Sequence, residues 1–571
     1  MEICDGSLFG HNFEITRKTG FGGLYSEMII NRRLIKDGSD IPLGFYGIKT
    51  DKTDKTVGLG QISNQFVFLS HIEYVFKIWV KSDAPAVVKA VIKSRYFKIF
   101  YETEFNIPGN GELYYAESRF SVLPSASDCV LEITWDTDAG ASPEIQALSL
   151  TESDSYHGMR KDVLDKLKEM RPGSLRFPGG CFAEYYDWKD GISPPHERKG
   201  FYIKELPFLL PQTFGTDPHD VGIDEFIMAC RYVGAEPQIT VRLSDNEPED
   251  AAALVEYCNG SSETKWGRLR ISRGYIEPYG VKTWYIGNEL AGFGRNGMNA
   301  DGKLAASVTE KFGAAMKKAD PSIETVASTW FNTDGAACDW TGDFIKTYNK
   351  FDIASLHNYL NDYNAVYGEI KDSGDIQKVV DAPFEYLLPH IKNARNYLNG
   401  KPIAFDEWNY LWDRYGSAFT GIYAAGALHA LIKNKEKLGI KHACYFHPIN
   451  ESALRVTRAK IDFAPDGTVF KYLSEHIGGI ILEDKHSTQK LDVLQTAHKA
   501  KNRIITSVIN RDVYNSRENP VRTGGKCEKC VLISPENGNI RHSDFHIAES
   551  REIPDMIPPM SLAVIIISNQ S

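Results

Sequence analysis

The sequence predicts an α/β protein in which a (β/α)8 barrel is interrupted near its start by one β-sandwich and followed by a second. Three observations predict this class. Eight short apolar runs recur with helical patterns between most of them, alternating runs fill residues 51–152, and the helical period is lost after about residue 454. Parallel strands with helical crossovers can close into a barrel when eight are present. We expect four segments, which are the first barrel strand and helix (1–50), the inserted sandwich (51–152), the rest of the barrel (153–453) and the C-terminal sandwich (454–571).

Length, charge and cysteine usage exclude several classes of protein. The 571 residues carry a formal net charge of −10, which argues against a polyanionic partner such as DNA. No run of about 18 apolar residues could span a bilayer. The start of the chain lacks the basic and apolar regions of a secretory signal, and the nine cysteines indicate reduced thiols rather than a disulfide framework. We expect a cytoplasmic protein with a neutral substrate and with no nucleic-acid or membrane partner.

The individual elements follow from hydrophobic period and turn residues. The first unit reads as a strand at 8–14, a glycine turn at 20–23 and a helix at 24–31. Short alternating runs separated by turns predict two antiparallel sandwiches, the inserted one and the C-terminal one. The strands predicted for the inserted sandwich lie at 66–69, 74–80, 86–92, 97–101 and 130–135, and those for the C-terminal sandwich at 493–497, 503–509, 530–533 and 562–567. The seven further barrel strands are predicted at 174–178, 237–242, 281–286, 323–327, 351–356, 402–405 and 442–446.

Two predicted barrel strands end in a glutamate flanked by asparagine. Glu289 closes the run Tyr-Ile-Gly-Asn-Glu, and Glu407 lies within Phe-Asp-Glu-Trp-Asn. A carboxylate at the edge of an apolar run loses hydration, and this cost suggests a use. The C-terminal ends of barrel strands open on one face, so these glutamates should meet there. Other strand ends add polar and aromatic side chains to that face, namely Glu14, Arg176, Arg242, Trp330, His357, Tyr359 and His447.

Paired carboxylates among hydroxyl-binding side chains suit the hydrolysis of a glycosidic bond, in which one carboxyl protonates the leaving oxygen and the other attacks or activates water. Histidines and cysteines are not spaced as a metal-ligand set in this part of the sequence, so we expect neither a metal nor a cofactor.

Several motifs also have less specific interpretations. A lone strand-end glutamate is more often part of a surface ion pair than of a catalytic site. Arg176 could equally be the buried partner of a strand-end carboxylate, and Cys181 is a packed thiol more often than a nucleophile. The glycines in 292–297 satisfy a dinucleotide pattern, but the polar Asn-Glu before them indicates a loop. Cys527 and Cys530 are interpreted as ordinary thiols because a second pair is missing.

At the two glutamate motifs the sequence resembles family 51 of the glycoside hydrolases, the α-L-arabinofuranosidases. The similarity extends over most of the chain. It is carried by the opening segments 9–14 and 22–32, by 175–182 with 187–192, and by 223–259 and 357–359. The inserted sandwich resembles a carbohydrate-binding-like module that some members carry.

The resemblance implies a retaining double displacement that releases α-L-arabinofuranosyl residues from arabinan or arabinoxylan fragments. It makes Glu407 the nucleophile and Glu289 the acid/base, with carboxyl groups only about 5 Å apart. It also implies a homo-oligomer, trimeric or hexameric. Residues that would bind the furanose ring or orient the nucleophile are Glu14, Arg176, Cys181, Asn288 and Tyr359, with His357 beside them. Trp330 and His447 are expected to bind substrate from their place at strand ends, not from the resemblance.

The sequence departs from the family pattern at two places. The eighth strand reads Cys-Tyr-Phe-His-Pro at 444–448, where the family presents a glutamine-containing run, and residues 295–296 also differ. Two alternatives therefore stay open, which are an endo-glucanase or xylosidase on the same scaffold and a non-catalytic carbohydrate-binding protein.

Overall fold

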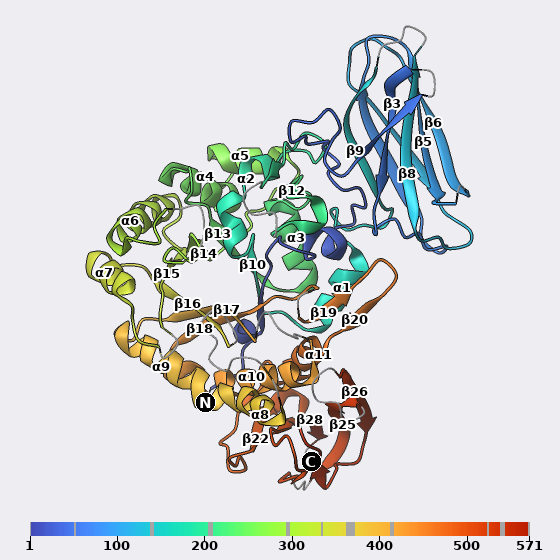
Figure 1. The fold of residues 1–571 in the computed structure, drawn as a ribbon. Helices are drawn as coiled ribbons and strands as arrows, with labels where there is room; N and C mark the ends of the chain where they lie inside the picture. The colour runs from blue at the N-terminus through green and yellow to red at the C-terminus, as the bar shows by residue number, and fades with distance from the viewer. Residues whose placement is uncertain are drawn as a thin grey trace.

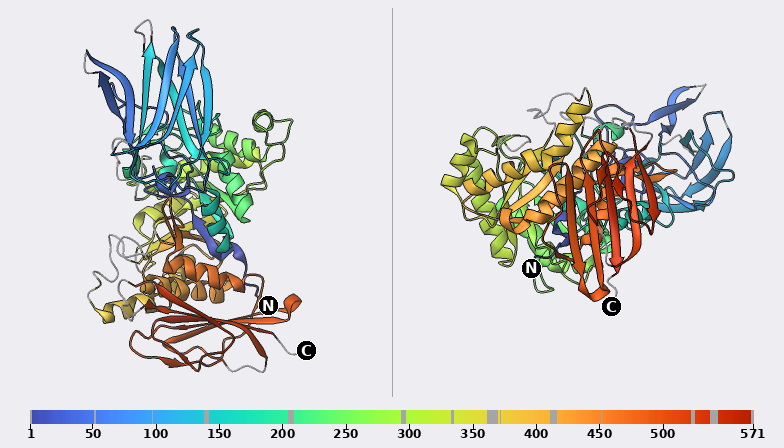
Figure 2. Two further views of the ribbon diagram at one scale, coloured as in Figure 1. Left: turned by 90° about the vertical axis from the view of Figure 1, so that its right-hand side faces the viewer. Right: turned by 90° about the horizontal axis from the view of Figure 1, so that it is seen from below.

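The computed structural model describes residues 2–50, 53–96, 98–137, 142–203, 209–292, 297–332, 335–360, 370, 372–410, 416–450, 452–521, 525–536 and 543–568. A barrel forms the centre of the molecule, the inserted sandwich stands at one end and the C-terminal sandwich closes the other (Figures 1 and 2). Within the described residues, we find no helix that combines the length and the apolar composition needed to cross a membrane.

Eight parallel strands close into the barrel in the order of the sequence, which confirms the predicted (β/α)8 TIM barrel. They are β1 (Gly10–Asn12), β10 (Ser174–Phe177), β13 (Glu236–Val241), β14 (Thr283–Ile286), β15 (Glu324–Ser328), β16 (Ile353–Tyr359), β17 (Ile403–Asn409) and β18 (Ile440–Phe446). The helices around them are α1 (Lys161–Glu169), α3 (Ile223–Val233), α4 (Pro248–Asn259), α5 (Lys265–Ser272), α6 (Gly302–Ala319), α7 (Asp339–Thr347), α8 (Ser373–Ala382), α9 (Leu388–Tyr397) and α10 (Ala418–Leu438).

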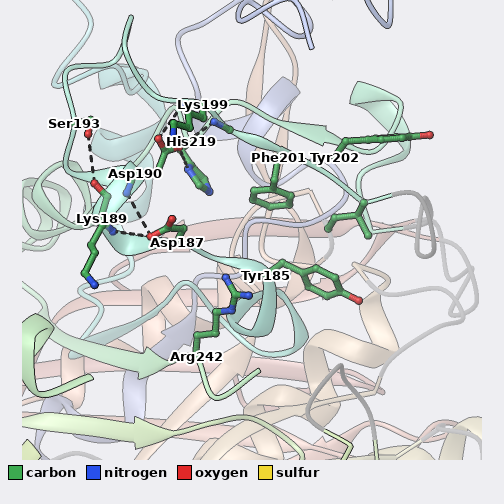
Figure 3. Close-up of a pocket in the computed structure, with 12 residues that line it drawn as sticks. Tyr185, Asp187, Lys189, Asp190, Ser193, Lys199, Phe201, Tyr202, His219 and Arg242 are labelled. Atoms are coloured by element: carbon green, nitrogen blue, oxygen red, sulfur yellow. Dashed lines mark hydrogen bonds and ion pairs between the residues drawn. The ribbon is translucent and has the colours of Figure 1, made fainter. Parts of the chain in front are cut away.

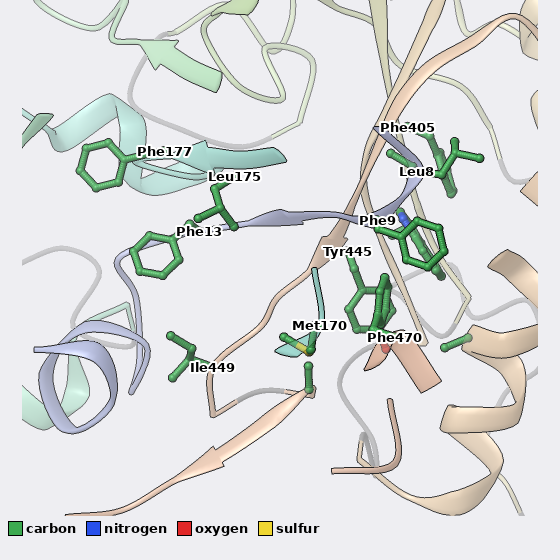
Figure 4. Close-up of a cluster of buried hydrophobic side chains, with 14 of the residues drawn as sticks. Leu8, Phe9, Phe13, Met170, Leu175, Phe177, Phe405, Tyr445, Ile449 and Phe470 are labelled. Atoms are coloured by element: carbon green, nitrogen blue, oxygen red, sulfur yellow. The ribbon is translucent and has the colours of Figure 1, made fainter. Parts of the chain in front are cut away.

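Burial explains why these strands read as continuous apolar runs. Parallel strands covered by helices are buried on both faces, and every residue of β10 and β17 is buried. Around the barrel strands, apolar side chains from segments far apart in sequence meet (Figure 4). There Phe470 packs against Phe9 and Tyr445, with ring centroids 6.2 and 5.0 Å away.

The helix predicted at 24–31 is wrong. The chain instead makes a single π turn, Gly20–Leu24, in which Gly22 has φ +86°, and then runs irregularly toward the sandwich. Glu27 explains the irregular path, because its Oε1 accepts the backbone N–H groups of Met28, Ile29 and Leu150 at 2.9–3.0 Å. The helix that connects β1 to β10 is α1, which follows the inserted sandwich.

Two antiparallel sheets form the inserted sandwich. One has the order β2-β3-β8-β5-β6 and the other β7-β4-β9. The strands are β2 (Tyr46–Thr50), β3 (Thr53–Ile62), β4 (Tyr74–Lys81), β5 (Ala86–Ser94), β6 (Ile99–Ile107), β7 (Tyr114–Phe120), β8 (Cys129–Thr137) and β9 (Glu144–Glu152). Arg458, fully buried after the barrel, fixes the crossing by donating to the carbonyls of Tyr25, Ser26 and Glu27.

The C-terminal sheet has the order β21-β22-β23-β28-β25-β26, with the small pair β24-β27 beside it. Its strands are β21 (Ile480–Ile481), β22 (Leu491–His498), β23 (Arg503–Asn510), β24 (Arg517–Glu518), β25 (Lys526–Pro535), β26 (Phe545–Ser550), β27 (Met556–Ile557) and β28 (Ser561–Ser568). Before it, α11 (Pro465–Leu473) packs on α10, in a stretch where the sequence suggested loss of the helical period. We propose that the C-terminal sandwich begins near residue 480.

Candidate active site

The carboxylate of Glu407 lies at the end of β17, where three side chains donate to it. Nη1 of Arg176 lies 2.7 Å and Nδ2 of Asn12 lies 3.0 Å from its Oε1. The hydroxyl of Tyr359 lies 2.6 Å from its Oε2. These donors come from β10, β1 and β16, so the closed barrel brings together residues that are far apart in sequence. A carboxylate with both oxygens bound by charged or phenolic donors is held in one orientation.

Glu289 follows β14 and faces Glu407 across the strand ends. Its backbone lies in the left-handed region with φ +44°, and Gly287 two residues earlier has φ +70°. A non-glycine residue at positive φ is uncommon and is often found at functional sites. The turn places the Glu289 carboxylate against His357, whose Nδ1 lies 2.8 Å from Oε1.

His357 connects the two glutamates to a deeper carboxylate. Its Nε2 lies 3.1 Å from Oδ2 of Asp406, and its Nδ1 also lies 3.4 Å from Oε2 of Glu407. Burial opposes a charge on the ring, but the carboxylates of Glu407 and Asp406 outweigh it and raise the pKa of His357 well above its usual value. The ring is therefore an imidazolium that donates from both nitrogens.

Asp406 is the fully buried anion beneath this histidine. Ser355 donates its hydroxyl to it at 2.9 Å, and Nη2 of Arg176 lies 3.6 Å away. Burial raises the pKa of Asp406, but the charges of His357 and Arg176 and the hydrogen bonds lower it below its ordinary value overall. Asp406 and Glu407 in turn raise the pKa of Arg176 against its burial. The site is thus a compact set of alternating charges.

Arg176 also orients Asn288, since its Nη2 donates to Oδ1 of that amide at 2.6 Å. The Asn288 amide nitrogen is thereby turned toward Cys181, whose Sγ is 3.9 Å away. Cys181 Sγ lies 3.7 Å from Oε2 of Glu289. Burial and the charge of Glu289 raise the pKa of the Cys181 thiol well above its usual value, so it stays protonated and is no nucleophile.

The glycine pair after β10 lets Glu14 and Glu407 approach this segment closely. A Cβ on Gly179, which has φ +105°, would lie 2.3 Å from Cα of Glu14, and one on Gly180 would lie 2.4 Å from Oε1 of Glu407. Glu14 accepts the backbone N–H of Phe182 at 2.9 Å. Burial and the charge of Glu407 raise the pKa of Glu14 to about 7.

Eight of the ten predicted site residues therefore come together within one cluster, which comprises Glu14, Arg176, Cys181, Asn288, Glu289, His357, Tyr359 and Glu407. Trp330 lies beside it, with its ring 3.0 Å from a Cβ built on Gly292 in the turn after Glu289. His447 does not join the cluster. It is fully buried and its ring bonds to the hydroxyl of Thr19 at 3.1 Å.

Two polar neighbours of the cluster were given no role from the sequence, although Asp406 was recognised as a strand-end residue. Asn12 is the last residue of β1, and Asp406 precedes Glu407 in β17. For Asn12 and Asp406 alike, the signal in the sequence was a polar residue at the end of an apolar barrel strand. The phenyl ring of Phe446 packs edge-on against Tyr359 with centroids 5.6 Å apart. The contact of the eighth strand with Tyr359 is therefore made by Phe446, where His447 was expected.

The cluster also contains the one described set of side chains with metal-ligand spacing. Carboxylate and imidazole atoms of Glu289, His357 and Glu407 lie within 4.8 Å of one another. His357 already donates to Glu289 and Asp406, and a protonated ring has no lone pair for a metal. The donor set fits an imidazolium between carboxylates better than it fits a cation site.

A comparison with known proteins adds an independent observation. Residues 166–372, which include Glu289, Arg176 and His357, match the family model described as alpha-L-arabinofuranosidase 1 domain. The chain is 34% identical over 258 residues to the intracellular exo-alpha-(1->5)-L-arabinofuranosidase of Halalkalibacterium halodurans, covering 44% of this chain and 49% of that one. It is 35% identical over 261 residues to a protein of the same name from Bacillus subtilis, with the same coverage. The chain thus spans about half the length of the curated relatives it matches.

Solved structures agree in fold over a longer stretch. An arabinose-bound GH51 α-L-arabinofuranosidase superposes with a TM-score of 0.75 at 15% identity, covering 100% of this chain and 98% of that chain. The α-L-arabinofuranosidase of Thermotoga maritima superposes with a TM-score of 0.57 at 24% identity, covering 73% of this chain and 91% of that one. At such identities the superpositions show the fold alone. Residues 166–372 and the aligned parts of the curated relatives are thus similar to α-L-arabinofuranosidases, and the superpositions show that the chain shares the fold of GH51 structures.

Proposed function

We propose that the protein is a retaining glycoside hydrolase that releases α-L-arabinofuranosyl residues from arabinose-containing glycans. The observation that carries the proposal is the spacing of the two glutamates, since one carboxylate oxygen of Glu289 lies within 4.8 Å of one of Glu407. Retaining enzymes place their carboxyl groups about 5–5.5 Å apart, whereas inverting enzymes need about 6.5–9.5 Å to admit a water molecule. The spacing supports attack by a carboxylate rather than by water.

In the first step Glu407 attacks the anomeric carbon while Glu289 donates a proton to the departing oxygen, so that the sugar becomes bonded to Glu407. Arg176 and Asn12 donate to Oε1 of Glu407 and Tyr359 donates to Oε2. These three hydrogen bonds fix the orientation of the attacking carboxylate. In the second step Glu289 takes a proton from water, and the hydroxide oxygen displaces Glu407 from the same carbon.

His357 positions Glu289 in both steps of the reaction. Its Nδ1 donates to Oε1 of Glu289 and its Nε2 donates to Asp406, so the ring cannot rotate without losing one of these bonds. Glu289 must exchange a proton twice per turnover, and a charged donor on one of its oxygens leaves the other oxygen to carry that proton. The carboxylates of Glu407 and Asp406 raise the pKa of His357 and keep the ring in the charged form.

Hydrolysis of an aryl α-L-arabinofuranoside tests the function, with the early product anomer followed by NMR. We expect release of the phenol with retained configuration, and loss of at least 10⁴-fold in kcat for Glu407→Ala. A wild-type protein that releases no phenol, or a Glu407→Ala variant as active as the wild type, would contradict the proposal. Release with inverted configuration would refute the retaining mechanism alone.

A second candidate, an endo-glucanase or xylosidase on the same scaffold, is favoured by one observation. The eighth strand presents Phe446 to Tyr359 and buries His447, so the wall expected to bind the sugar is apolar there. Higher activity on aryl xylosides or mixed-linkage glucan than on arabinofuranosides would favour this candidate. Sugar binding by the whole chain without any turnover would favour the non-catalytic reading.

The names of the relatives extend the proposal in two respects. The curated relatives are named exo-acting and intracellular, which supports exo action on arabinan fragments and a cytoplasmic location for this protein. We include a homo-oligomer, trimeric or hexameric, in the proposal, and light scattering after size-exclusion chromatography measures it directly.

A further inference from the structure

A polar groove of about 900 Å³ lies between the segment that follows β10 and the end of β13 (Figure 3). Its lining combines aromatic rings with cationic side chains, among them Tyr185, Lys199, Phe201, Tyr202 and Arg242. The proposed hydrolysis needs only the cluster itself. The groove is therefore available for the part of the glycan that lies beyond the scissile bond.

A short 3-10 helix, η3 (Cys181–Tyr185), joins the groove to the cluster. Cys181 at its start contacts Glu289 at 3.7 Å, and Tyr185 at its end lines the groove. The four residue steps from Cys181 to Tyr185 in a 3-10 helix span about 8 Å, which is less than the length of two sugar units. The ring of Phe182, in the same helix, packs against Phe201 with centroids 5.5 Å apart.

Glu184 links the two walls of the groove. Its buried Oε2 accepts the backbone N–H groups of Leu243 and Ser244 and the Ser244 hydroxyl at 2.7–3.2 Å. Nε of Arg242 in turn donates to the Ser244 carbonyl at 2.7 Å. The guanidinium is thus anchored at one nitrogen, and in Figure 3 its side chain extends toward Tyr185 and Asp187.

The acidic side chains of the groove already have strong donors. Asp187 accepts the N–H groups of Lys189 and Asp190 at the start of a helical turn. Asp190 accepts the N–H groups of Lys199 and Gly200, and His219 lies 2.6 Å from its Oδ2. Burial acts against the charge of Asp190, but these bonds lower its pKa below the ordinary value.

Of the two cations Arg242 and Lys199, Arg242 has one long ion pair and lies near the buried carboxylate of Glu184, whose pKa is raised by burial and lowered by the Arg242 charge. The nearest carboxylate oxygen to Arg242 among the described residues belongs to Asp245, at 3.8 Å from Nη2, and that side chain is 70% exposed. Lys199 is exposed and has no ion pair within the described part of the chain. Lys189, by contrast, is paired with Asp250. A 3.8 Å pair with a partner as exposed as Asp245 contributes little, so the Nη groups of Arg242 and the ammonium of Lys199 can bind an incoming anion.

We propose that this groove binds a uronic acid residue of the glycan that carries the arabinofuranosyl group, with Arg242 and Lys199 on its carboxylate and Phe201 and Tyr202 against its ring. The inference rests on the proposed function and specifies its substrate class as acidic, uronate-bearing glycans. A neutral arabinan would fill the same groove without satisfying either cation.

A matched pair of substrates tests it. The substrates are a disaccharide in which an α-L-arabinofuranosyl residue is linked to a hexuronic acid, and the methyl ester of the same disaccharide. Hydrogen bonds to charged groups correspond to roughly tenfold or more in affinity. We expect the wild type to cleave the acid with a kcat/KM about tenfold above that of the ester at low salt. The preference should fall as salt rises to 0.5 M, since an exposed charge contact is screened.

Variants of Arg242 and Lys199 test whether the groove causes the preference for the acid over the ester. We expect the acid-to-ester ratio to fall at least threefold in Arg242→Gln and in Lys199→Gln. The control Lys318→Gln removes one exposed positive charge at the end of α6 and should keep the wild-type ratio. Equal cleavage of acid and ester by the wild type, or an unchanged ratio in both groove variants, would overturn the inference.

A binding measurement separates this inference from the proposed function. Digalacturonate, which has no arabinofuranosyl group, is titrated into the full-length wild type and into Arg242→Gln by calorimetry. We expect binding by the wild type that is weakened at least fivefold in the variant. If no arabinofuranoside is cleaved, the proposed function fails, and this titration still tests whether the groove binds a uronic acid. Absence of digalacturonate binding by the wild type would overturn the inference whatever the activity.

Discussion

The phenol of Tyr359 lies 2.6 Å from Oε2 of Glu407, while Arg176 and Asn12 occupy the other oxygen of the same carboxylate. Burial and the charge of Glu407 raise the pKa of Tyr359 well above its usual value, so its hydroxyl remains a donor at any pH of interest. The nucleophile is thus held by groups that do not change protonation during an assay.

This contact predicts the effect of Tyr359→Phe. Loss of a hydrogen bond to a charged group costs roughly 1.5–3 kcal/mol, which corresponds to about a 10- to 100-fold lower kcat if the bond orients the attacking oxygen. Steady-state kinetics on an aryl α-L-arabinofuranoside measure it. Tyr232→Phe, which removes a hydroxyl bonded to exposed Asp165, is the control and should keep wild-type kinetics. Equal kcat for both variants would contradict the assigned role.

The Asp406–His357 contact predicts a change in pH dependence. Asp406 raises the pKa of His357, so Asp406→Asn should lower it and allow the ring to lose its proton at lower pH. The alkaline limb of kcat/KM should therefore move toward neutral pH, together with a fall in kcat. Ser355→Ala keeps the Asp406 charge and should move the limb less. An unshifted limb in Asp406→Asn would show that His357 does not limit activity at high pH.

The barrel and most of the site could be predicted from the sequence, because apolar strands end in polar residues. The contact of Asp406 with Arg176 could not be predicted, for a physical reason. Side chains of a regular strand alternate, so Asp406 and Glu407 should face opposite sides. The pairing of β17 with β18 is irregular between Phe405 and Trp408, and that of β16 with β17 shifts between Ser355 and His357. These irregularities turn both carboxylates toward Arg176, and no local sequence signal marks them.

The other differences arise from contacts distant in sequence. The segment 24–31 has helical spacing, but Glu27 bonds to Leu150 of the inserted sandwich, and tertiary contacts override the local preference. His447 was expected at the site because it follows β18, yet Thr19 binds its ring inside the protein. Burial lowers the pKa of His447 well below its usual value, so this ring stays neutral and acts in packing.

A buried histidine pair between α10 and the C-terminal sheet predicts acid lability. Ser507 Oγ lies 2.6 Å from Nε2 of His429 and 2.8 Å from Nε2 of His476. Burial lowers the pKa of both rings, His476 most strongly. Below about pH 6.5 the unfolded chain therefore binds more protons than the folded one, and stability falls as pH falls. We expect Tm to drop between pH 7.5 and 5 more steeply for the wild type than for His476→Gln. Exposed His486→Gln should keep the wild-type slope, and equal slopes for all three proteins would contradict the prediction.

Glu27 predicts the opposite pH trend. Burial and the charge of Asp220 raise its pKa to about 7, so between about pH 4.5 and 7 the folded protein binds more protons and its stability falls as pH rises. Glu27→Gln keeps an Oε1 acceptor for the amides of Met28, Ile29 and Leu150 while removing the charge. We expect its Tm to match the wild type below about pH 4.5, to exceed it increasingly up to about pH 7, and to keep that excess at pH 8. Glu483→Gln, exposed on the surface, should track the wild type throughout, and a Glu27→Gln protein that does the same would show that the carboxylate is not raised in pKa.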